Sequence, residues 1–540
     1  MRHIVQTSMN FSRSLLVAGM AGLMFGVIGV RGAMVATGEN SQNLTGPSKY
    51  TQTMPRADIL DRNGELLATS VAVYSLFADP REIWDGKEVA ESLAEVFPDM
   101  DAEKLSQRLQ NRRRAFVWVK RGLTPRQRQS VLDLGLEGLG FRAESKRIYP
   151  KGTLAGHVLG HTGIDGQGQM GVELSYEARL ARTQSPVSLT LDSGVQFALE
   201  AELAAAAERY QAIGASGIVL EVKSGKLRGL ASWPAFNPNR PSMVDPAVRR
   251  NRAVNEVYEL GSVLKPIAIA AALEAGAVKD TESFNVMEPV RMRGHTFRDA
   301  HPYAPRLDVG MVLAKSSNVG TVKITQKLGA PGLKAFYDKL GLLGPADIAL
   351  PANGRPILPP DWTNLATATA SLGHGIAISP LMLTEAYGAI ANQGLKAPLS
   401  IVEEETSRAP ERVMRKDVAQ SLVTMLRSTV LNGTGRRADV PGYRIAGKTG
   451  TAEKPIPGGY AKDRNITSFA SLFPANDPEY VILITLDEPK ASEAFPGVTA
   501  AWNAAPTTAR VVERIAPLLG VSPQFDQVAL ERMYRQRSAR

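Results

Sequence analysis

Apolar positions near the start of the chain form one long run without charges. Residues 14–30 are rich in Leu, Val, Gly and Met, and Arg31 follows them. These seventeen residues lie at the short end of the length that crosses a bilayer as a helix. A cleaved signal peptide is the alternative, but the small-residue pattern that cleavage requires is poor near Ala36. We therefore predict an uncleaved transmembrane anchor over residues 14–36, with residues 1–13 as a cytoplasmic tail.

The pattern changes to shorter periods after a polar stretch that begins at residue 37. Asn63-Gly64 stands between two short apolar runs, which is a strong signal for a β-hairpin. Residues 71–140 mix short strand and helix patterns, and a Gly-rich stretch ends at Glu173. These patterns predict a mixed α+β domain over residues 37–186.

A second region begins with an Ala-rich helical pattern. Asp192 can cap a helix that runs to about Tyr210. Residues 216–221 and 227–232 then read as two strands around a Lys-Ser-Gly turn, which predicts the start of an antiparallel sheet. Residues 480–486 form a further apolar strand. An α+β fold with an antiparallel sheet and helices is therefore expected here as well.

Length and composition agree with this division. A chain of 540 residues holds at least two domains, and we assign residues 187–525 to the second and residues 526–540 to a basic tail. Cysteine is absent, which excludes disulfide scaffolds, thiol catalysis and Cys-ligated metals. The net charge is +10, but basic runs such as Arg112 to Arg114 lack interleaved aromatic residues. This favours a solvated or membrane-facing surface over a nucleic-acid groove.

Ser262 and Lys265 form the only Ser-x-x-Lys motif in the chain. Residues 267–273 are apolar and Ala-rich, and Pro266 fits only near a helix start, so a buried helix opens close to Ser262. Three residues apart, the two side chains share one helix face. A lysine with a lowered pKa can take the hydroxyl proton of a neighbouring serine, and the helix N-terminus offers N–H groups to an oxyanion.

Most Ser-x-x-Lys matches are surface residues, so two later motifs carry the argument. The tripeptide Ser316-Ser317-Asn318 can bring a hydroxyl and an amide to one cavity from a loop. Ser316 is suited to relay a proton between Lys265 and a leaving amine. Asn318 is suited to hold both a substrate amide and Lys265.

The third motif, residues 448–451, offers one cation and two hydroxyls to a carboxylate. These groups are Lys448, Thr449 and Thr451, and Gly450 between them lets the backbone approach a substrate closely. A cation at Lys448 near Lys265 is also expected to lower the pKa of that base.

A different function is suggested by residues 442–449, which fit the P-loop pattern of nucleotide triphosphatases. A P-loop follows a buried strand and opens a helix. Here Pro441 precedes the match, and Pro455 and Pro457 follow it, so neither element is expected. Nucleotide binding is therefore a remote alternative.

The order Ser-x-x-Lys, Ser-x-Asn, Lys-Thr-Gly is far more specific than any single motif. Together with residues 56–68, 147–173 and Gly373-His374-Gly375, it makes the chain resemble the class B penicillin-binding proteins, which are peptidoglycan D,D-transpeptidases. Within that class the chain is most similar to the division-specific FtsI type. It departs from the usual pattern at Leu260, where proline is common, and at residues 495–506, which replace a Tyr-Gly-Gly-rich segment.

The resemblance implies a role for each motif residue. Ser262 would attack a D-Ala-D-Ala carbonyl with Lys265 as the general base, and a second stem peptide would then accept the acyl group. The backbone N–H groups of Ser262 and Thr451 would form the oxyanion hole. The remaining implied roles are proton transfer and positioning by Ser316 and Asn318, and substrate binding by Lys448, Thr449, Gly450 and Thr451.

The resemblance also implies an architecture and partners. An antiparallel sheet between helices would stand on an extended N-terminal pedestal domain, anchored by one helix in the bacterial inner membrane with the catalytic domain in the periplasm. β-Lactams would trap the serine, and no metal or organic cofactor is implied. The expected protein partners are an FtsW-like glycan polymerase and other divisome membrane proteins.

Other readings of the same motifs stay open at this point. A β-lactamase needs a deacylating Glu near the site, and the chain between Asn318 and Pro380 contains none. A D,D-carboxypeptidase would hydrolyse the acyl-enzyme instead of transferring it. A non-catalytic divisome scaffold is disfavoured because both lysines and the asparagine are present.

Overall fold

The computed structural model describes residues 55–404 and 408–525, together with Gly22 and Gly26. The predicted cytoplasmic and C-terminal tails lie outside the described residues, as does the predicted anchor apart from these two glycines. Within the described ranges, no helix has the length and apolar character needed to cross a membrane. The chain divides into two compact units, Met1–Thr53 and Met54–Arg540, and the elements below belong to the second.

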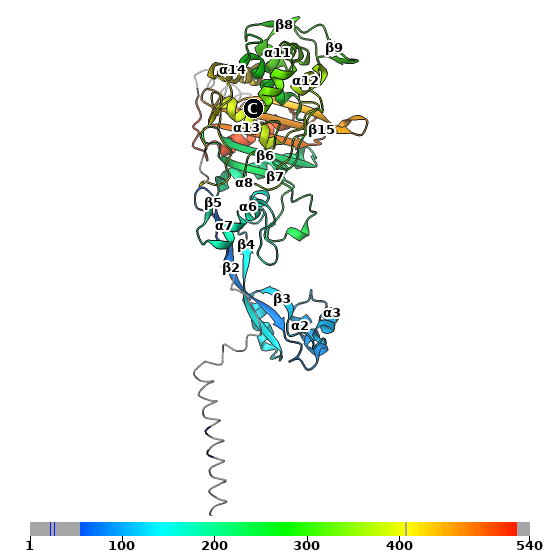
Figure 1. Cartoon of the computed structure of the whole chain (residues 1–540), viewed down its shortest axis with the longest axis vertical. Coiled ribbons are helices and arrows are strands. Elements are labelled where there is room, and N and C mark those ends of the chain that lie inside the picture. Colours follow the sequence, from blue (N-terminus) through cyan, green and yellow to red (C-terminus); the bar gives the residue numbers. More distant parts are fainter. Residues whose placement is uncertain (1–21, 23–25, 27–54, 405–407, 526–540) are drawn as a thin grey trace, which may run out of the picture. The chain divides into compact units, whose positions relative to one another are not determined.

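The first sheet is built around one long strand, β2, which pairs antiparallel with three other strands (Figure 1). The hairpin predicted at Asn63-Gly64 joins β1 to β2 and is confirmed, with Gly64 at a φ of +83°. A fifth strand, β5, lies parallel to β1. The strands of this sheet are β1 (Ile59–Leu60), β2 (Leu66–Ala78), β3 (Val117–Leu123), β4 (Leu139–Ile148) and β5 (Val187–Ser188).

Three amphipathic helices pack with β3 and the end of β2 into a separate hydrophobic cluster. Each begins where a polar side chain accepts a hydrogen bond from the first turn, and these caps are Asp85, Asp101 and Thr124. The three helices are α2 (Gly86–Val96), α3 (Ala102–Leu109) and α4 (Pro125–Asp133). Shorter helices follow further along the chain: α5 (Gly156–Leu159), α6 (Gly171–Ser175) and α7 (Glu177–Arg182).

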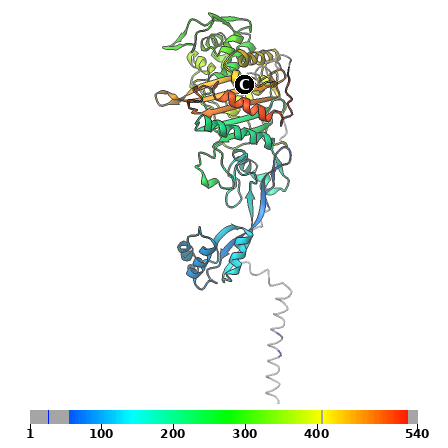
Figure 2. The ribbon, with the colours of Figure 1, turned by 180° about the vertical axis from the view of Figure 1, so that it is seen from behind.

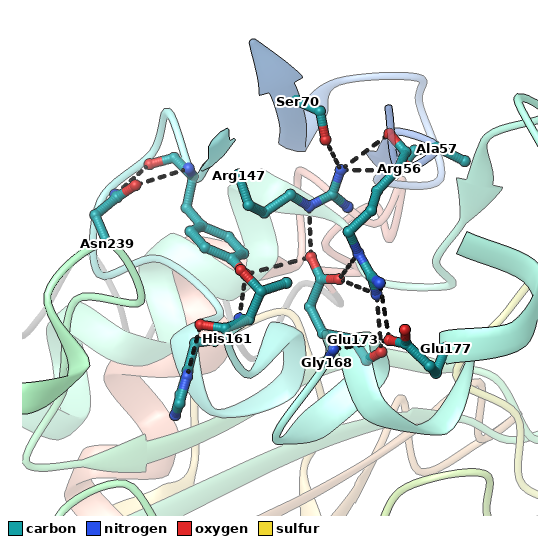
Figure 3. A network of polar contacts seen from close by, with 11 residues as sticks. Arg56, Ala57, Ser70, Arg147, His161, Gly168, Glu173, Glu177 and Asn239 are labelled. Atoms are coloured by element: carbon teal, nitrogen blue, oxygen red, sulfur yellow. Dashed lines mark hydrogen bonds and ion pairs between the residues drawn. The ribbon is translucent and has the colours of Figure 1, made fainter. Parts of the chain in front are cut away.

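A buried ion cluster joins the start of this region to the end of β4 and to α6 (Figure 3). The Glu173 carboxylate, which has no exposed surface, accepts from Arg56 Nη2 at 2.8 Å and from Arg147 Nε at 2.6 Å. The Tyr149 hydroxyl donates to the same carboxylate at 3.3 Å, and Glu177 binds the other edge of the Arg56 guanidinium at 2.8 Å. Segments more than a hundred residues apart in sequence are therefore tied together by one carboxylate.

The second sheet has five antiparallel strands in the order β14-β15-β16-β6-β7. The two strands predicted at residues 216–221 and 227–232 and the later strand at 480–486 are confirmed as neighbours in this sheet. Every residue of β16 is buried, so both faces of the sheet are covered. The strands are β6 (Gly214–Glu221), β7 (Leu227–Trp233), β14 (Ala446–Ile456), β15 (Gly459–Phe473) and β16 (Tyr480–Asp487).

Helices cover the two faces of this sheet (Figures 1 and 2). α8 (Ser193–Arg209), capped by Asp192 as predicted, packs with α15 (Ala504–Ile515) on one face. α13 (Pro380–Ala391) lies against β6, β15 and β16, and α14 (Lys416–Asn432) against β14. The predicted α+β fold with an antiparallel sheet between helices is confirmed.

The remaining elements lie around these helices. A 3-10 turn, η2 (Gly261–Leu264), leads directly into the buried helix α9 (Lys265–Glu274). The other helices are η1 (Pro241–Met243), α10 (Val309–Lys315), α11 (Asn318–Lys339), α12 (Asn364–Ser371) and η3 (Arg436–Ala438). The other strands are β8 (Ser283–Asn285), β9 (Val290–Met292), β10 (His295–Phe297), β11 (Arg306–Asp308), β12 (Leu395–Lys396) and β13 (Glu411–Arg412).

Candidate active site

Ser262 lies in the η2 turn, where glycines let three segments meet closely. Gly261 has a φ of +64° and donates its N–H to the Gly373 carbonyl at 3.1 Å. A Cβ at Gly261 would lie 2.7 Å from the Thr451 carbonyl oxygen, and one at Gly373 would lie 2.1 Å from the Gly261 oxygen. The half-buried Ser262 is therefore held between the residue 373–375 turn and strand β14.

Lys265 joins the first motif to the second. It is the first residue of α9, and its side chain has no exposed surface. Its Nζ donates to the Ser316 carbonyl at 2.6 Å, to Asn318 Oδ1 at 2.7 Å and to Ser316 Oγ at 3.2 Å. The structure therefore places Lys265 of the first motif in hydrogen-bond contact with Ser316 and Asn318 of the second motif.

The second motif forms the junction of two helices, whereas the sequence suggested an open loop. Ser316 ends α10 in the left-handed conformation, with a φ of +60°. Ser317 caps α11 by accepting from Gly320 N at 2.9 Å, and Asn318 is the first residue of α11. Helix ends fix backbone geometry better than a loop, so Ser316 Oγ and Asn318 Oδ1 have defined positions facing Lys265.

Lys448 lies near the start of strand β14 and is also completely buried. Its Nζ donates to Ser316 Oγ at 3.0 Å and to the Thr449 carbonyl at 3.0 Å. The Ser316 hydroxyl therefore stands between the two lysine ammonium groups. Because Lys448 belongs to a strand that continues to Ile456, the P-loop interpretation, which requires a helix after this motif, is wrong.

The rest of the third motif is positioned by residues that the sequence did not single out. Thr449 Oγ1 lies 2.6 Å from Thr434 Oγ1, and Thr451 Oγ1 accepts from Ala500 N at 3.1 Å. A Cβ at Gly450 would lie 2.3 Å from the Leu260 carbonyl, so this glycine permits the contact with the Ser262 turn. The segment after β16, where the chain departs from the family pattern, therefore does reach the site.

Burial sets the protonation of both lysines. It lowers the pKa of Lys265 to about 7, while the nearby carboxylate of Asp299 acts in the opposite direction. Burial lowers the pKa of Lys448 well below its usual value, and repulsion from Lys265 adds to this. The predicted like-charge effect of Lys448 on Lys265 is not found: burial alone lowers the pKa of Lys265, and the repulsion acts on Lys448 instead. With a pKa of about 7, part of Lys265, three residues after Ser262, is a neutral amine near neutral pH.

Two acidic residues at the site were not predicted. Asp299 accepts from the backbone N–H groups of Asn318 and Val319 and from the Ser317 hydroxyl. Glu259, three residues before Ser262, accepts from Gly375 N at 3.0 Å and from the Tyr460 hydroxyl at 3.2 Å, and it lies 3.2 Å from His374 Nδ1. Neither residue lies in a motif or on a periodic face, so only the tertiary fold reveals them.

The comparisons with known proteins agree with this geometry. A model described as the penicillin binding protein transpeptidase domain matches residues 215–507, and one for the penicillin-binding protein dimerisation domain matches residues 51–202. The probable peptidoglycan D,D-transpeptidase FtsI of Caulobacter vibrioides is 37% identical over 88% of this chain and 83% of its own length. The chain belongs to the class B penicillin-binding proteins, of the FtsI type.

Further relatives of this penicillin-binding protein support the same assignment. The family predicted from the sequence is therefore confirmed. The peptidoglycan D,D-transpeptidase FtsI of Escherichia coli K12 is 31% identical over 83% of this chain and 81% of its own length. The crystal structure of penicillin binding protein 3 from Mycobacterium tuberculosis, complexed with aztreonam, covers 88% of this chain and 98% of its own, with a TM-score of 0.69 and 28% identity. The fold is therefore the penicillin-binding transpeptidase fold with an N-terminal dimerisation domain.

Proposed function

We propose that this penicillin-binding protein is a peptidoglycan D,D-transpeptidase of cell division that works through an acyl-enzyme on Ser262. The observation that carries the proposal is the junction at the partly buried Ser316, whose hydroxyl lies 3.2 Å from Lys265 Nζ and 3.0 Å from Lys448 Nζ. It links all three motifs in one proton-transfer path. The family assignment supplies the substrate class, which is the D-Ala-D-Ala end of a stem peptide.

In the first half-reaction, Ser262 Oγ bonds to the carbonyl carbon of the penultimate D-Ala. Neutral Lys265 accepts the hydroxyl proton, and the backbone N–H groups of Ser262 and Thr451 bind the oxyanion. The peptide C–N bond then breaks, and the leaving amine of the terminal D-Ala receives a proton through Ser316. An acyl ester on Ser262 and a free D-Ala result.

In the second half-reaction, an amine of another stem peptide attacks the ester. The amine loses a proton to the same base as the new amide C–N bond forms, the ester C–O bond to Ser262 breaks, and Ser262 Oγ takes the proton back from the base. Asn318, which already binds Lys265, holds the peptide amide in both steps. A β-lactam follows only the first step, because its broken amide stays attached as part of the opened ring and no group departs.

The substrate's terminal carboxylate is assigned to the third motif. Lys448 has no exposed surface, so it lies behind the hydroxyls of Thr449 and Thr451, which meet the carboxylate directly. Gly450 brings this strand against the Ser262 turn. The contact with Ala500 N orients Thr451, so the segment after β16 contributes to carboxylate binding through that residue.

The location and partners complete the proposal. The uncharged run supports residues 14–36 as a single membrane anchor with residues 1–13 in the cytoplasm, and the catalytic domain at residues 187–525 in the periplasm. Residues 37–186 form the pedestal, where we expect an FtsW-like glycan polymerase and other divisome proteins to bind.

Transfer is separated from hydrolysis by supplying full-length protein with a synthetic donor ending in D-Ala-D-Ala and a labelled D-amino acid. The proposal predicts labelled, exchanged donor that is lost in Ser262→Ala and retained in Ser92→Ala, a partly exposed serine of α2. Release of D-Ala with no labelled product would show a D,D-carboxypeptidase. Rapid turnover of penicillin would show a β-lactamase.

A further inference from the structure

One carboxylate fixes the backbone of the second motif from outside it. Asp299 Oδ1 accepts from Asn318 N at 2.5 Å and from Val319 N at 3.0 Å, and its Oδ2 accepts from the Ser317 hydroxyl at 2.7 Å. The two backbone donors are the first N–H groups of α11, which have no partner within the helix. An anion there is also favoured by the helix dipole. Asp299 therefore holds the turn that presents Ser316 and Asn318 to Lys265.

The same carboxylate is the anionic group that acts on Lys265. Its negative charge raises the pKa of Lys265 against the larger, opposite effect of burial. Lys448 on β14 shares the Ser316 hydroxyl with Lys265, and repulsion from Lys265 adds to burial in lowering the pKa of Lys448. The ends of α10 and α11 present only the neutral groups of Ser316 and Asn318 to the amine.

Other groups near Asp299 do not offset its charge at the amine. Arg298 faces Asn318 with its backbone carbonyl, which accepts from Asn318 Nδ2 at 3.1 Å, while its side chain is exposed. The Tyr303 hydroxyl donates to the Lys315 carbonyl at 2.9 Å, and burial together with the charge of Asp299 raises its pKa. Tyr303 therefore stays neutral at the pH of the reaction.

We propose that Asp299 is a positioning residue for acylation, which fixes the Ser316–Asn318 turn that faces Lys265 and whose negative charge favours the protonated form of that amine. The inference rests on the proposed roles of Ser262 and Lys265. It adds one anion to the groups that act on the base. Without the anion, Lys265 is free of its proton at lower pH.

Two substitutions separate the charge of Asp299 from its hydrogen bonds. Asp299→Asn keeps an oxygen for the two backbone N–H groups and an amide for the Ser317 hydroxyl, but it removes the charge. Ser317→Ala keeps the charge and removes one hydrogen bond to Asp299 and the cap on Gly320 N. Asp85→Asn is the matched control, because Asp85 also accepts from two N–H groups at a helix start, at α2.

The test is the second-order rate of acylation of the full-length protein by a fluorescent penicillin across a pH series. Asp299→Asn is expected to move the acid limb about one pH unit lower, because a neighbouring opposite charge shifts a pKa by about one unit or more. The ratio of variant to wild-type rate then rises about tenfold from high to low pH. Ser317→Ala is expected to slow acylation at every pH with the limb unmoved, and Asp85→Asn to match the wild type in rate and limb.

A ratio that does not change with pH would overturn the inference, as would an equal limb shift in Ser317→Ala. If Asp299→Asn does not fold, Asp299→Glu takes its place: the charge stays, so the limb must stay while the plateau rate falls, and a shifted limb contradicts the proposal. Acylation that persists in Ser262→Ala would instead contradict the proposed function. The two failures are therefore distinguishable.

Discussion

At the scale of single residues, the site depends on two lysines that are buried around one hydroxyl. Desolvation disfavours the charged form of each amine, and their proximity through Ser316 makes the doubly charged state costly. Such an arrangement gives little stability and is explained by the need for a neutral amine. Lys265 can supply this neutral amine to Ser262, because it follows Ser262 by three residues, directly after the η2 turn.

Acylation by penicillin is predicted to rise with pH and to level off above about pH 7. Lys265 must be neutral to act as a base, and burial lowers its pKa to about 7, so activity is lost as pH falls below that value. Lys265→Arg, which stays charged, is expected to slow acylation about a thousandfold on the plateau above pH 7 and to remove the fall toward acid pH. Stopped-flow rates with a fluorescent penicillin measure both effects. Lys104→Arg, an exposed change on α3, is the control.

At the scale of elements, the site is assembled by close backbone contacts that only glycine permits. Gly261→Ala would place a Cβ against the Thr451 carbonyl at a positive φ. We expect a loss of roughly 1–3 kcal/mol in unfolding free energy and slower acylation because the Ser262 turn moves away from β14. Urea titration and labelling rates measure the two losses. Gly344→Ala has open space around its Cβ and no positive φ, so an equal effect there would contradict the account.

The ion cluster at Glu173 yields a second prediction at this scale. Glu173→Gln removes the buried negative charge that the guanidinium groups of Arg56 and Arg147 share, and we expect roughly 3–5 kcal/mol of destabilisation. Glu177→Gln removes a half-exposed partner of the same Arg56 and should cost well under half as much. Chemical denaturation of both variants compares the costs. Equal losses would mean that the burial of Glu173 contributes little to the stability that this cluster provides.

Elements with local signals could be predicted from the sequence. The Asn63-Gly64 turn, the Asp192 cap and the alternating strands of the 216–232 hairpin depend on neighbouring residues, and each is found in the structure. The order of the second sheet could not be predicted, because β16 pairs with β6 across more than two hundred residues. Asp299 and Thr434 were missed for the same reason: their partners are distant in sequence.

At the scale of the whole molecule, the apolar run near the start predicts how the chain is held in the cell. Full-length protein is expected in the membrane fraction and to resist extraction by salt and alkaline carbonate, because apolar side chains rather than charges hold it. A variant without residues 1–36 is expected in the soluble fraction with its penicillin labelling retained. Release of the full-length protein by salt alone would contradict the anchor.

The residues of the candidate site, in contrast, could be predicted from the order of the three motifs along the chain. Ser262, Lys265, Ser316, Asn318 and Lys448 are spread over nearly two hundred residues, and the structure joins the last four through hydrogen bonds. The contacts of β14 with η2 bring Ser262 to the same place. The motifs indicate which reaction these residues can carry out. The second sheet and the junction of α10 and α11 determine how far apart the residues lie.

The most direct test of the central claim is mass spectrometry of the full-length protein after reaction with benzylpenicillin. The account predicts one covalent adduct with the mass of the whole penicillin, on the peptide that contains Ser262, and no adduct in a folded Ser262→Ala variant. An adduct on another residue, or none on the folded wild-type protein, would contradict the claim that Ser262 is the nucleophile.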